Sequence, residues 1–250
     1  MMRFQNKVAL VSGGGTGIGR ATALAFAREG AMVAICGRRK EPLEKTVKDI
    51  QKEGGQAIFF TCDVSRVQEV EKVVSDTVNK FGRIDILFNN AGINRPSRFA
   101  ETTDDDINIL IDTNVKGQLW MMRAVLRQML KQGKGGAIVN MSSQLGLIGH
   151  VDEVVYCASK GAISNMTRAL ALEVTGDGIR VNAVCPGAID TDMLQIAGPE
   201  GVASFIGGAP INRAADPMEV AQGVLFLASE QASYIAGANL VIDGGFTAGK

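Results

Sequence analysis

The chain has 250 residues, and its 26 basic side chains balance 26 acidic ones, so that the formal net charge at neutral pH is zero. A neutral chain lacks the basic footprint that binds nucleic acid or an anionic membrane surface, and we expect neither as a partner. Apolar residues make up 46% of the sequence, yet no uninterrupted apolar run approaches the roughly 20 residues that a membrane-spanning helix requires.

The first residues, MMRFQNKVALVSGG, enter a strand pattern at once and leave no room for a cleavable signal peptide, so a reduced cytoplasmic setting is expected. The four cysteines lack the paired spacing of a zinc site or a redox dithiol and are interpreted as small buried hydrophobes. They are Cys36, Cys62, Cys157 and Cys185. With His150 as the only histidine, we predict no metal site and a mechanism that uses other groups.

Seven short apolar runs alternate with longer amphipathic segments. The runs are KVALVS, AMVAICG, AIFFTCDV, IDILFNN, GAIVNMSS, IRVNAVCPG and NLVIDGG. Because their apolar residues are continuous rather than alternating, we expect strands that are buried on both faces. Helices are predicted over 16–29, 41–53, 67–81, 104–132, 155–175 and 217–229. The alternation predicts one α/β domain over residues 1–250, a doubly wound parallel seven-stranded sheet with helices on both faces, which is a Rossmann fold.

A glycine-rich turn follows the first strand, in Ser12-Gly13-Gly14-Gly15-Thr16-Gly17-Ile18-Gly19. Glycines let the backbone pass close to a pyrophosphate, and the start of the next helix offers free amides and a positive dipole end. Similar turns serve methyltransferases and flavoproteins, and some are only tight turns, but the Gly-Lys-Ser/Thr ending of an ATPase loop is absent. The predicted dinucleotide contacts here are Gly13, Gly14, Thr16, Gly17, Ile18 and Gly19.

Two arginines, Arg38 and Arg39, stand at the end of the second strand. A carboxylate in this place would bind a ribose 2′-hydroxyl, whereas a guanidinium forms charge-assisted hydrogen bonds with a 2′-phosphate. We therefore predict a preference for NADP(H), with NAD(H) not excluded. The alternative is that both arginines belong to a solvated loop together with Lys40.

The ends of the third and fourth strands complete the same rim. Small or amide-bearing residues there can approach an adenine or bond neighbouring backbone. Asp63 is equally well explained as the cap of the next helix. The predicted contacts are Asp63, Val64, Asn90, Ala91 and Gly92.

Tyr156 and Lys160 lie four residues apart at the start of a predicted helix and share one of its faces. A tyrosine with a pKa of about 10 is a poor base at neutral pH, but a nearby positive charge stabilises the phenolate and lowers that pKa. Tyr156 would then exchange a proton with an alcohol or a carbonyl. The alternative is a partly exposed tyrosine beside a surface lysine.

Taken in order, these motifs resemble the short-chain dehydrogenase/reductase family, in particular its 3-oxoacyl-[acyl-carrier-protein] reductases and related alcohol dehydrogenases. The resemblance covers essentially the full chain. It rests on the glycine turn, Asn89-Asn90-Ala91-Gly92, Asn114 in Thr113-Asn114-Val115, Ser142-Ser143, Tyr156 with Lys160, Pro186-Gly187-Ala188-Ile189 with Thr191, and the closing Leu240-Val241-Ile242-Asp243-Gly244-Gly245. Ser12 stands where the family commonly has threonine, and keeps a hydroxyl.

The resemblance implies a catalytic role for four residues. Ser143, thirteen residues before Tyr156, would hydrogen-bond the substrate oxygen, and Tyr156 would donate a proton as a hydride reaches the carbonyl carbon. Lys160 would bind the nicotinamide ribose and hold the tyrosine pKa down. Asn114 would support a water that links the lysine to solvent.

The family also fixes the nicotinamide with its Pro-Gly turn and a following threonine. Backbone amides and a hydroxyl suit a carboxamide, which carries both a donor and an acceptor. Thr191 is also explained as a plain helix N-cap. The residues concerned are Pro186, Gly187, Ile189 and Thr191.

From about 192 to 213 the chain loses its sheet patterning and is interrupted by Gly198-Pro199, Gly207-Gly208 and Pro210. We predict a lid that excludes water from the reaction, although its apolar side chains could instead pack onto the domain. Two acids, Asp152 and Glu153, stand at the predicted substrate mouth or on a solvated loop. The predicted substrate contacts are Ser143, Leu145, Glu153, Met193 and Leu194.

The sequence thus predicts an NADP(H)-dependent ketone reductase or secondary alcohol dehydrogenase, with 3-oxoacyl thioesters among the possible substrates. The alternatives are an NAD-dependent sugar or polyol dehydrogenase and a nucleotide-binding scaffold without turnover. By resemblance, the two long helices beginning near Asp104 and Val155 form the faces of a homo-tetramer. Their apolar residues include Leu119, Trp120, Met121, Met122, Ile163, Met166 and Leu170.

Overall fold

A computed structural model describes residues 2–249, in which the predicted strands form one parallel sheet with the order β3-β2-β1-β4-β5-β6-β7. Each strand lies within a predicted apolar run or differs from it by one residue, so the predicted fold class is confirmed. The strands are β1 (Val8–Ser12), β2 (Met32–Gly37), β3 (Gln56–Thr61), β4 (Ile86–Asn89), β5 (Gly136–Met141), β6 (Ile179–Pro186) and β7 (Asn239–Ile242).

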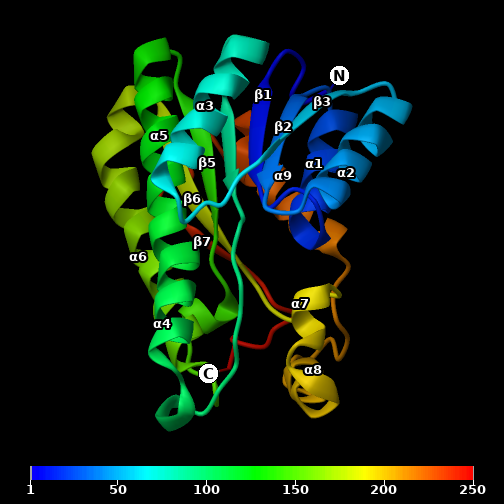
Figure 1. Cartoon of the computed structure of the whole chain (residues 1–250), viewed down its shortest axis with the longest axis vertical. Helices are drawn as coiled ribbons and strands as arrows, with labels where there is room; N and C mark the ends of the chain where they lie inside the picture. The colour runs from blue at the N-terminus through cyan, green and yellow to red at the C-terminus, as the bar shows by residue number, and fades with distance from the viewer. Residues whose placement is uncertain (1, 250) are drawn as a thin grey trace.

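Helices cover both faces of this sheet (Figure 1). The helices α1 (Gly17–Arg28), α2 (Lys40–Lys52) and α9 (Pro217–Ala228) pack on one face. The helices α3 (Val67–Phe81), α5 (Gly117–Gln132) and α6 (Val154–Val174) pack on the other. Because both faces of the sheet are covered, the central strands are buried, as in the fully buried β1, whereas the edge strands β3 and β7 remain partly exposed.

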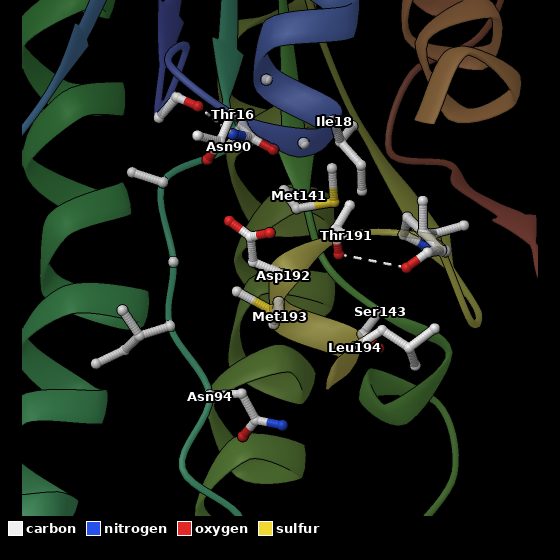
Figure 2. A pocket seen from close by; sticks show the side chains of 18 of the residues that line it. Thr16, Ile18, Asn90, Asn94, Met141, Ser143, Thr191, Asp192, Met193 and Leu194 are labelled. Atoms are coloured by element: carbon white, nitrogen blue, oxygen red, sulfur yellow. Dashed lines mark hydrogen bonds between the residues drawn. The ribbon is translucent and has the colours of Figure 1, made fainter. Parts of the chain in front are cut away.

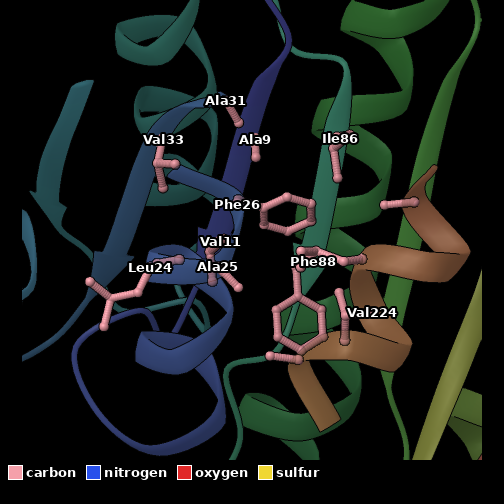
Figure 3. Close-up of a cluster of buried hydrophobic side chains, with 14 of the residues drawn as sticks. Ala9, Val11, Leu24, Ala25, Phe26, Ala31, Val33, Ile86, Phe88 and Val224 are labelled. Carbon is pink, nitrogen blue, oxygen red and sulfur yellow. The ribbon is translucent and has the colours of Figure 1, made fainter. Parts of the chain in front are cut away.

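Two apolar clusters hold these layers together. In the first, Phe26 of α1 meets Phe4 edge to face, with ring centroids 5.0 Å apart. Figure 3 shows Phe26 and Phe88 side by side between the sheet and α9, where Val224 reaches the same layer. Three cysteines are buried as predicted, whereas Cys157 is only half-buried. In the part of the chain from residue 2 to residue 249, no helix combines the length and the apolar character needed to cross a bilayer.

The helix predicted over 104–132 runs without a break in the chain direction, but its helical type changes along its length. It consists of α4 (Asp104–Leu110), a π-helical turn at Ile111–Lys116, and α5. A π turn contains an additional residue, and such turns are frequent at functional sites. Here the turn brings Asn114 inward, where its side chain is fully buried.

The segment predicted as a lid contains two short helices, α7 (Asp192–Gln195) and α8 (Gly198–Gly207). Gly198 has a φ of +69°, which separates the two helices, and Pro199 lies in the first turn of α8. In Figure 1 both helices stand apart from the layers, beyond the carboxyl ends of the strands. Apolar spacing over four to ten residues is too short to have predicted these helices from the sequence.

The strand order reverses between β1 and β4, since the chain moves from β1 toward β3 and later from β4 toward β7. The loops that follow β1 and β4 therefore leave the sheet in opposite directions. This leaves a crevice at their carboxyl ends, which is where open α/β sheets bind ligands.

Candidate active site

A pocket with a cavity volume of about 330 Å³ occupies this crevice and extends to the lid segment. Its lining comes from loops that follow β1, β2, β3, β4, β5 and β6, together with α6 and α7. Loops far apart in the sequence thus share one site because the parallel strands end at one edge. Figure 2 shows Thr16 and Asn90 at one end of the pocket and Ser143, Leu194 and Asn94 at the other.

The glycine turn forms one end of the pocket. Gly13 and Gly17 have φ values of +68° and +52°, which glycine adopts without steric cost. A Cβ on Gly19 would collide with the carbonyl oxygen of Gly13, so the turn also needs close backbone contact. The first amides of α1 consequently face the pocket, an arrangement that fits a pyrophosphate.

The hydroxyl of Ser12 ties this turn to the loop after β4. Ser12 Oγ accepts hydrogen bonds from the backbone amides of Asn90, at 2.9 Å, and Ala91, at 3.0 Å. In return, Asn90 Nδ2 donates to the Ser12 carbonyl at 3.0 Å. Replacement of the family's threonine by serine therefore preserves the function of the hydroxyl.

Gly14, one of the predicted dinucleotide contacts, packs against β2. It does not line the pocket, and a Cβ there would lie 2.6 Å from Ile35 Cβ, so its small size allows the turn to pack on β2. The neighbouring Gly15, which was not predicted, lines the pocket instead. Composition alone does not distinguish these two glycines, since both stand in one run.

Arg38 and Arg39 line the pocket and are solvent-exposed, and Arg39 Nη2 lies 3.4 Å from Thr16 Oγ1. Within residues 2–249 neither guanidinium has a salt-bridge partner within 4.0 Å. Both positive charges are therefore free to bind an anionic group beside the glycine turn.

Asp63 lines the same end of the pocket, together with Val64. Its Oδ1 accepts hydrogen bonds from the amide and the hydroxyl of Ser65, at 3.0 and 2.7 Å, so it closes a local turn and does not cap α3. Burial raises the pKa of Asp63, but the Ser65 hydrogen bonds and the charges of Arg38 and Arg66 outweigh it, and the net pKa is lowered. The carboxylate is therefore ionised at neutral pH.

The other end of the pocket brings Ser143, Tyr156 and Lys160 together. Ser143 follows β5, and its Oγ accepts a hydrogen bond from the Leu145 amide at 3.1 Å. Lys160 Nζ donates to the Met141 carbonyl at 2.8 Å and lies 5.5 Å from the centroid of the Tyr156 ring. The phenol and the ammonium share one face of α6, as the sequence spacing predicted.

The pKa of Tyr156 differs from the sequence-based expectation. Burial raises it above its usual value and the charge of Glu153 raises it further, whereas a hydrogen bond with Ser143 lowers it. The Lys160 ammonium is directed at the Met141 carbonyl, and burial lowers its own pKa to about 8. The phenol therefore holds its proton at neutral pH, and the expected lowering by Lys160 is not found in this structure.

Asn114 does not line the pocket, but its side chain bonds two segments that do. Its Oδ1 accepts from the Ile93 amide at 2.9 Å, and its Nδ2 donates to the Ile93 carbonyl at 2.9 Å and to Ser159 Oγ at 3.3 Å. The Ser159 hydroxyl in turn donates to the Tyr156 carbonyl at 2.8 Å. Asn114 thus links the loop after β4 to the helix that carries the tyrosine.

The Pro-Gly turn after β6 lies between these two ends, and Pro186, Gly187, Ile189 and Thr191 all line the pocket as predicted. Thr191 stands at the N-cap position of α7 but makes no capping hydrogen bond there. Its hydroxyl lies 3.3 Å from the Ile189 carbonyl (Figure 2), and a Cβ on Gly17 would lie 3.1 Å from its methyl carbon. The turn and α7 thus close over the glycine loop.

Leu145, Met193 and Leu194, which were predicted as substrate contacts, also line the pocket. The helix α8 adds Phe205, whose ring stacks on His150 with centroids 4.5 Å apart and an interplanar angle of 17°. The segment predicted as a lid is therefore in contact with the loop that leads into α6.

Glu153, a predicted substrate contact, does not line the pocket. Its side chain is only 3% exposed, and Oε1 accepts a hydrogen bond from Asn94 Nδ2 at 2.9 Å. Asn94 lines the pocket in its place (Figure 2). The position of Asn94, two residues after the Asn89-Asn90-Ala91-Gly92 turn, is the sequence feature that could have predicted it.

Gln144, which the sequence suggested as a candidate for the substrate mouth, also lines the pocket. It is 2% exposed, and its Oε1 is buried without a hydrogen-bond partner among the described residues. It follows the predicted Ser143 directly, and its short helical turn, Gln144–Gly146, directs the side chain toward Gly187. The sequence says less about Phe205, because a single apolar residue in a segment interrupted by glycine and proline does not show which side of a helix is buried.

The fold and these paired ends define a dinucleotide-dependent oxidoreductase of the Rossmann class. A family model described as enoyl-(acyl carrier protein) reductase matches residues 13–247. The chain belongs to the short-chain dehydrogenase/reductase family, whose members use a nicotinamide cofactor.

Named relatives in this family span the same length. A meso-2,3-butanediol dehydrogenase of Serratia marcescens is 41% identical over 247 residues, which is 99% of this chain and 97% of that protein. A 3-oxoacyl-[acyl-carrier-protein] reductase of Thermotoga maritima is 39% identical over 244 residues, which is 98% of this chain and 99% of that protein. The crystal structure of levodione reductase has a TM-score of 0.95 and 34% identity, and the match covers 99% of this chain and 100% of that one.

The buried carboxyl of Glu153 predicts a pH-dependent stability difference. Burial raises its pKa to about 7, so the folded protein binds this proton more tightly than the unfolded chain does. The favourable contribution is complete below the usual glutamate pKa and is lost as the pH rises toward 7. Because glutamine resembles the protonated acid, we expect Glu153→Gln to be about 1–3 kcal/mol more stable than the wild type near pH ~8, with a shrinking advantage near pH ~5.

Thermal melting followed by circular dichroism at both pH values would measure this difference. Asp152→Asn is a matched control, since Asp152 is exposed and asparagine tolerates its φ of +61°. A stability gap between Glu153→Gln and the wild type that stays constant with pH would contradict the prediction.

Proposed function

We propose that the protein reduces a ketone to a secondary alcohol with NADPH, or catalyses the reverse oxidation, with Tyr156 as the proton donor and acceptor. The observation that carries this proposal is the meeting of Ser143, Tyr156 and Lys160 in the same pocket as the glycine turn. The phenol, the hydroxyl and the ammonium occupy one end, and the phosphate-binding turn occupies the other. That distance between ends suits an extended dinucleotide.

The described residues fit a nicotinamide dinucleotide. The free amides of the glycine turn would hold its pyrophosphate, and the Pro186-Gly187 turn with Thr191 would hold the carboxamide. When bound there, the nicotinamide supplies or accepts the hydride.

The residues of this chain would handle the substrate oxygen and its proton. Ser143 donates a hydrogen bond to the carbonyl oxygen, while the protonated phenol of Tyr156 delivers its proton to that oxygen as the carbon accepts a hydride. The carbonyl carbon gains a hydride, which carries two electrons, and the oxygen gains one proton, so that the product is an alcohol. The tyrosinate then regains its proton from solvent. Burial keeps the phenol protonated before the reaction, which favours proton donation at neutral pH.

Lys160 would stabilise the transient tyrosinate. Its ammonium lies 5.5 Å from the ring centroid and is held by the Met141 carbonyl. Because the site is buried, water would screen the attraction between this ammonium and a tyrosinate only little. The loss of a proton from Tyr156 is therefore partly offset by an attraction to Lys160.

We propose that the substrate is a ketone or a secondary alcohol. 3-Oxoacyl thioesters, which carry a ketone, are among the candidates. Apolar side chains, namely Leu145, Met193, Leu194 and Phe205, line much of this end of the pocket. The relatives named for butanediol, 3-oxoacyl and levodione substrates support this class. We also propose that residues 192–213 act as a lid, since α7 and α8 supply three of these four side chains.

We further propose a homo-tetramer, by analogy with the family. Met121, Met122 and Ile163, which the sequence suggested for its faces, belong to the core, so they do not support it. Leu119 on α5 and Leu172 on α6 are 40% and 89% exposed and remain available for burial between subunits.

Removal of the Tyr156 hydroxyl tests the proposed chemistry. Tyr156→Phe is expected to lower kcat by about 10²–10⁴-fold, because the substrate oxygen loses its proton donor. Turnover would be measured by nicotinamide absorbance with a panel of ketones, diketones and 3-oxoacyl thioesters. Binding of NADPH, measured by fluorescence, should be retained. Tyr234→Phe is the matched control, because Tyr234 is fully exposed, and turnover by Tyr156→Phe at the rate of this control would refute the proton-donor role.

Arg38→Asp tests the choice of cofactor. A carboxylate in place of the guanidinium repels a 2′-phosphate and accepts a hydrogen bond from a 2′-hydroxyl, so KM for NADPH should rise about tenfold or more while KM for NADH falls. Lys40→Asp makes the same charge change next to the site, at a residue outside the pocket lining. Unchanged Michaelis constants for both cofactors in Arg38→Asp would remove the arginine from the cofactor site.

Light scattering across a range of protein concentrations tests the oligomer. We expect the mass of four chains, and a smaller mass for Leu172→Glu, because a charge on this face disfavours its burial. A mass of one chain at every concentration would reject the tetramer.

A further inference from the structure

Glu153 is a buried carboxyl next to the catalytic helix. It immediately precedes α6, and its carbonyl accepts a hydrogen bond from the Cys157 amide at 2.7 Å, so it belongs to the first helical turn. Its side chain is 3% exposed. One carboxyl oxygen accepts from Asn94, while the other, Oε2, has no hydrogen-bond partner among residues 2–249. A carboxyl group is rarely buried with so few partners unless it has a specific role.

The groups around Glu153 contain no compensating cation. Asn94 approaches from the loop after β4, and Tyr156 and Cys157 follow on α6. Asp152 is the other charged neighbour and carries the same sign. In the part of the chain that the structure describes, no lysine or arginine lies within salt-bridge distance of Glu153. An ionised Glu153 would therefore act as a negative charge that no ion pair cancels.

Tyr156 is placed between this carboxyl and an ammonium. Glu153 precedes it by three residues and Lys160 follows it by four, so all three lie on neighbouring turns along one side of α6. The Lys160 ammonium favours a tyrosinate, whereas a negative Glu153 opposes one. The charged and titratable groups that act on the phenol are Glu153 and Cys157, whose charges raise its pKa, and Ser143, whose hydrogen bond lowers that pKa. The Lys160 ammonium lies 5.5 Å from the centroid of the same ring.

We propose that Glu153 is a positioning residue for proton transfer, whose buried negative charge, one helical turn before Tyr156, disfavours the tyrosinate and keeps Tyr156 protonated. This inference rests on the proposed function, in which Tyr156 exchanges a proton with the substrate. Its consequence is a bias toward carbonyl reduction, since reduction needs the phenol and oxidation needs the tyrosinate.

The bias depends on pH because Glu153 itself titrates. Burial raises its pKa to about 7, the Asn94 hydrogen bond lowers it, and the charge of Asp152 raises it. Below this pKa Glu153 is neutral and exerts no bias. Above it the carboxylate forms and postpones ionisation of Tyr156 to higher pH. Alcohol oxidation requires the tyrosinate, so in the wild type it should begin only at a higher pH.

Glu153→Gln tests this role, because it removes the charge and keeps the shape. The measurement is kcat/KM against pH in both directions, with acetoin and NADPH for reduction and with 2,3-butanediol and NADP⁺ for oxidation as probe pairs. We expect the rise of oxidation and the alkaline loss of reduction to move together to lower pH by about 0.5–1 unit. Asp152→Asn, with the same charge change at an exposed residue, should move them by less than about 0.3 unit.

A direct readout of Tyr156 makes the test independent of any substrate. The chain has two tyrosines, so in a Tyr234→Phe background the ultraviolet absorbance of tyrosinate reports Tyr156 alone. As the pH is raised to about 11, the onset of this absorbance should come earlier when Glu153→Gln is added. A purely structural role for Glu153 would alter stability or KM without moving this onset.

Coincident onsets with and without Glu153→Gln would overturn the inference, and so would a shift of both profiles to higher pH. Tyr156→Phe separates this failure from that of the proposed function. If Tyr156→Phe is inactive and the Glu153→Gln onset is unmoved, only the role of Glu153 is lost. If Tyr156→Phe keeps its turnover, the proposed proton transfer by Tyr156 is refuted, and the role of Glu153 is refuted as well.

Discussion

The hydrogen bonds of the Ser12 hydroxyl join the loops after β1 and β4, at the point where the strand order reverses. They join the end of β1 to the amides of Asn90 and Ala91 after β4, and the Asn90 side chain returns a bond to the Ser12 carbonyl. Asn90 Nδ2 also lies 3.3 Å from the Gly13 carbonyl, so both loops are joined at several points. With the loops tied, the glycine turn faces the same crevice as the segment from Gly92 to Asn94, and the nucleotide and substrate ends become one pocket.

Buried charge distinguishes the two ends of that pocket. At the nucleotide end, Arg38 and Arg39 are exposed, and water screens their charges until an anion binds. At the chemical end, Lys160 and Glu153 are almost fully buried, and burial shifts the pKa of each toward neutrality, to about 8 and about 7. Near neutral pH, the charge at the chemical end of the pocket therefore depends on the protonation of these two buried groups.

Much of the architecture follows from local sequence patterns. Continuous apolar runs fix the strands, and the four-residue spacing of Tyr156 and Lys160 fixes their shared face, because these features depend on neighbours in the chain. The exceptions depend on contacts between distant segments. The packing of Gly14 on β2, the winding of the chain around Asn114 and the hydrogen bond between Asn94 and Glu153 each need a partner more than 20 residues away. No pattern within one segment specifies such a partner.

The π-helical turn at Ile111–Lys116 also sets the rotational phase of everything that follows it. One additional residue in an α-helix rotates the subsequent side chains by about 100°. With this offset, Asn114 reaches the Ile93 backbone while Met121, Met122 and Val125 still meet the sheet. An uninterrupted α-helix would satisfy one of these two contact sets and lose the other. Loss of a single residue between Leu110 and Gly117 would therefore misalign the whole of α5 and expose apolar side chains that now lie in the core.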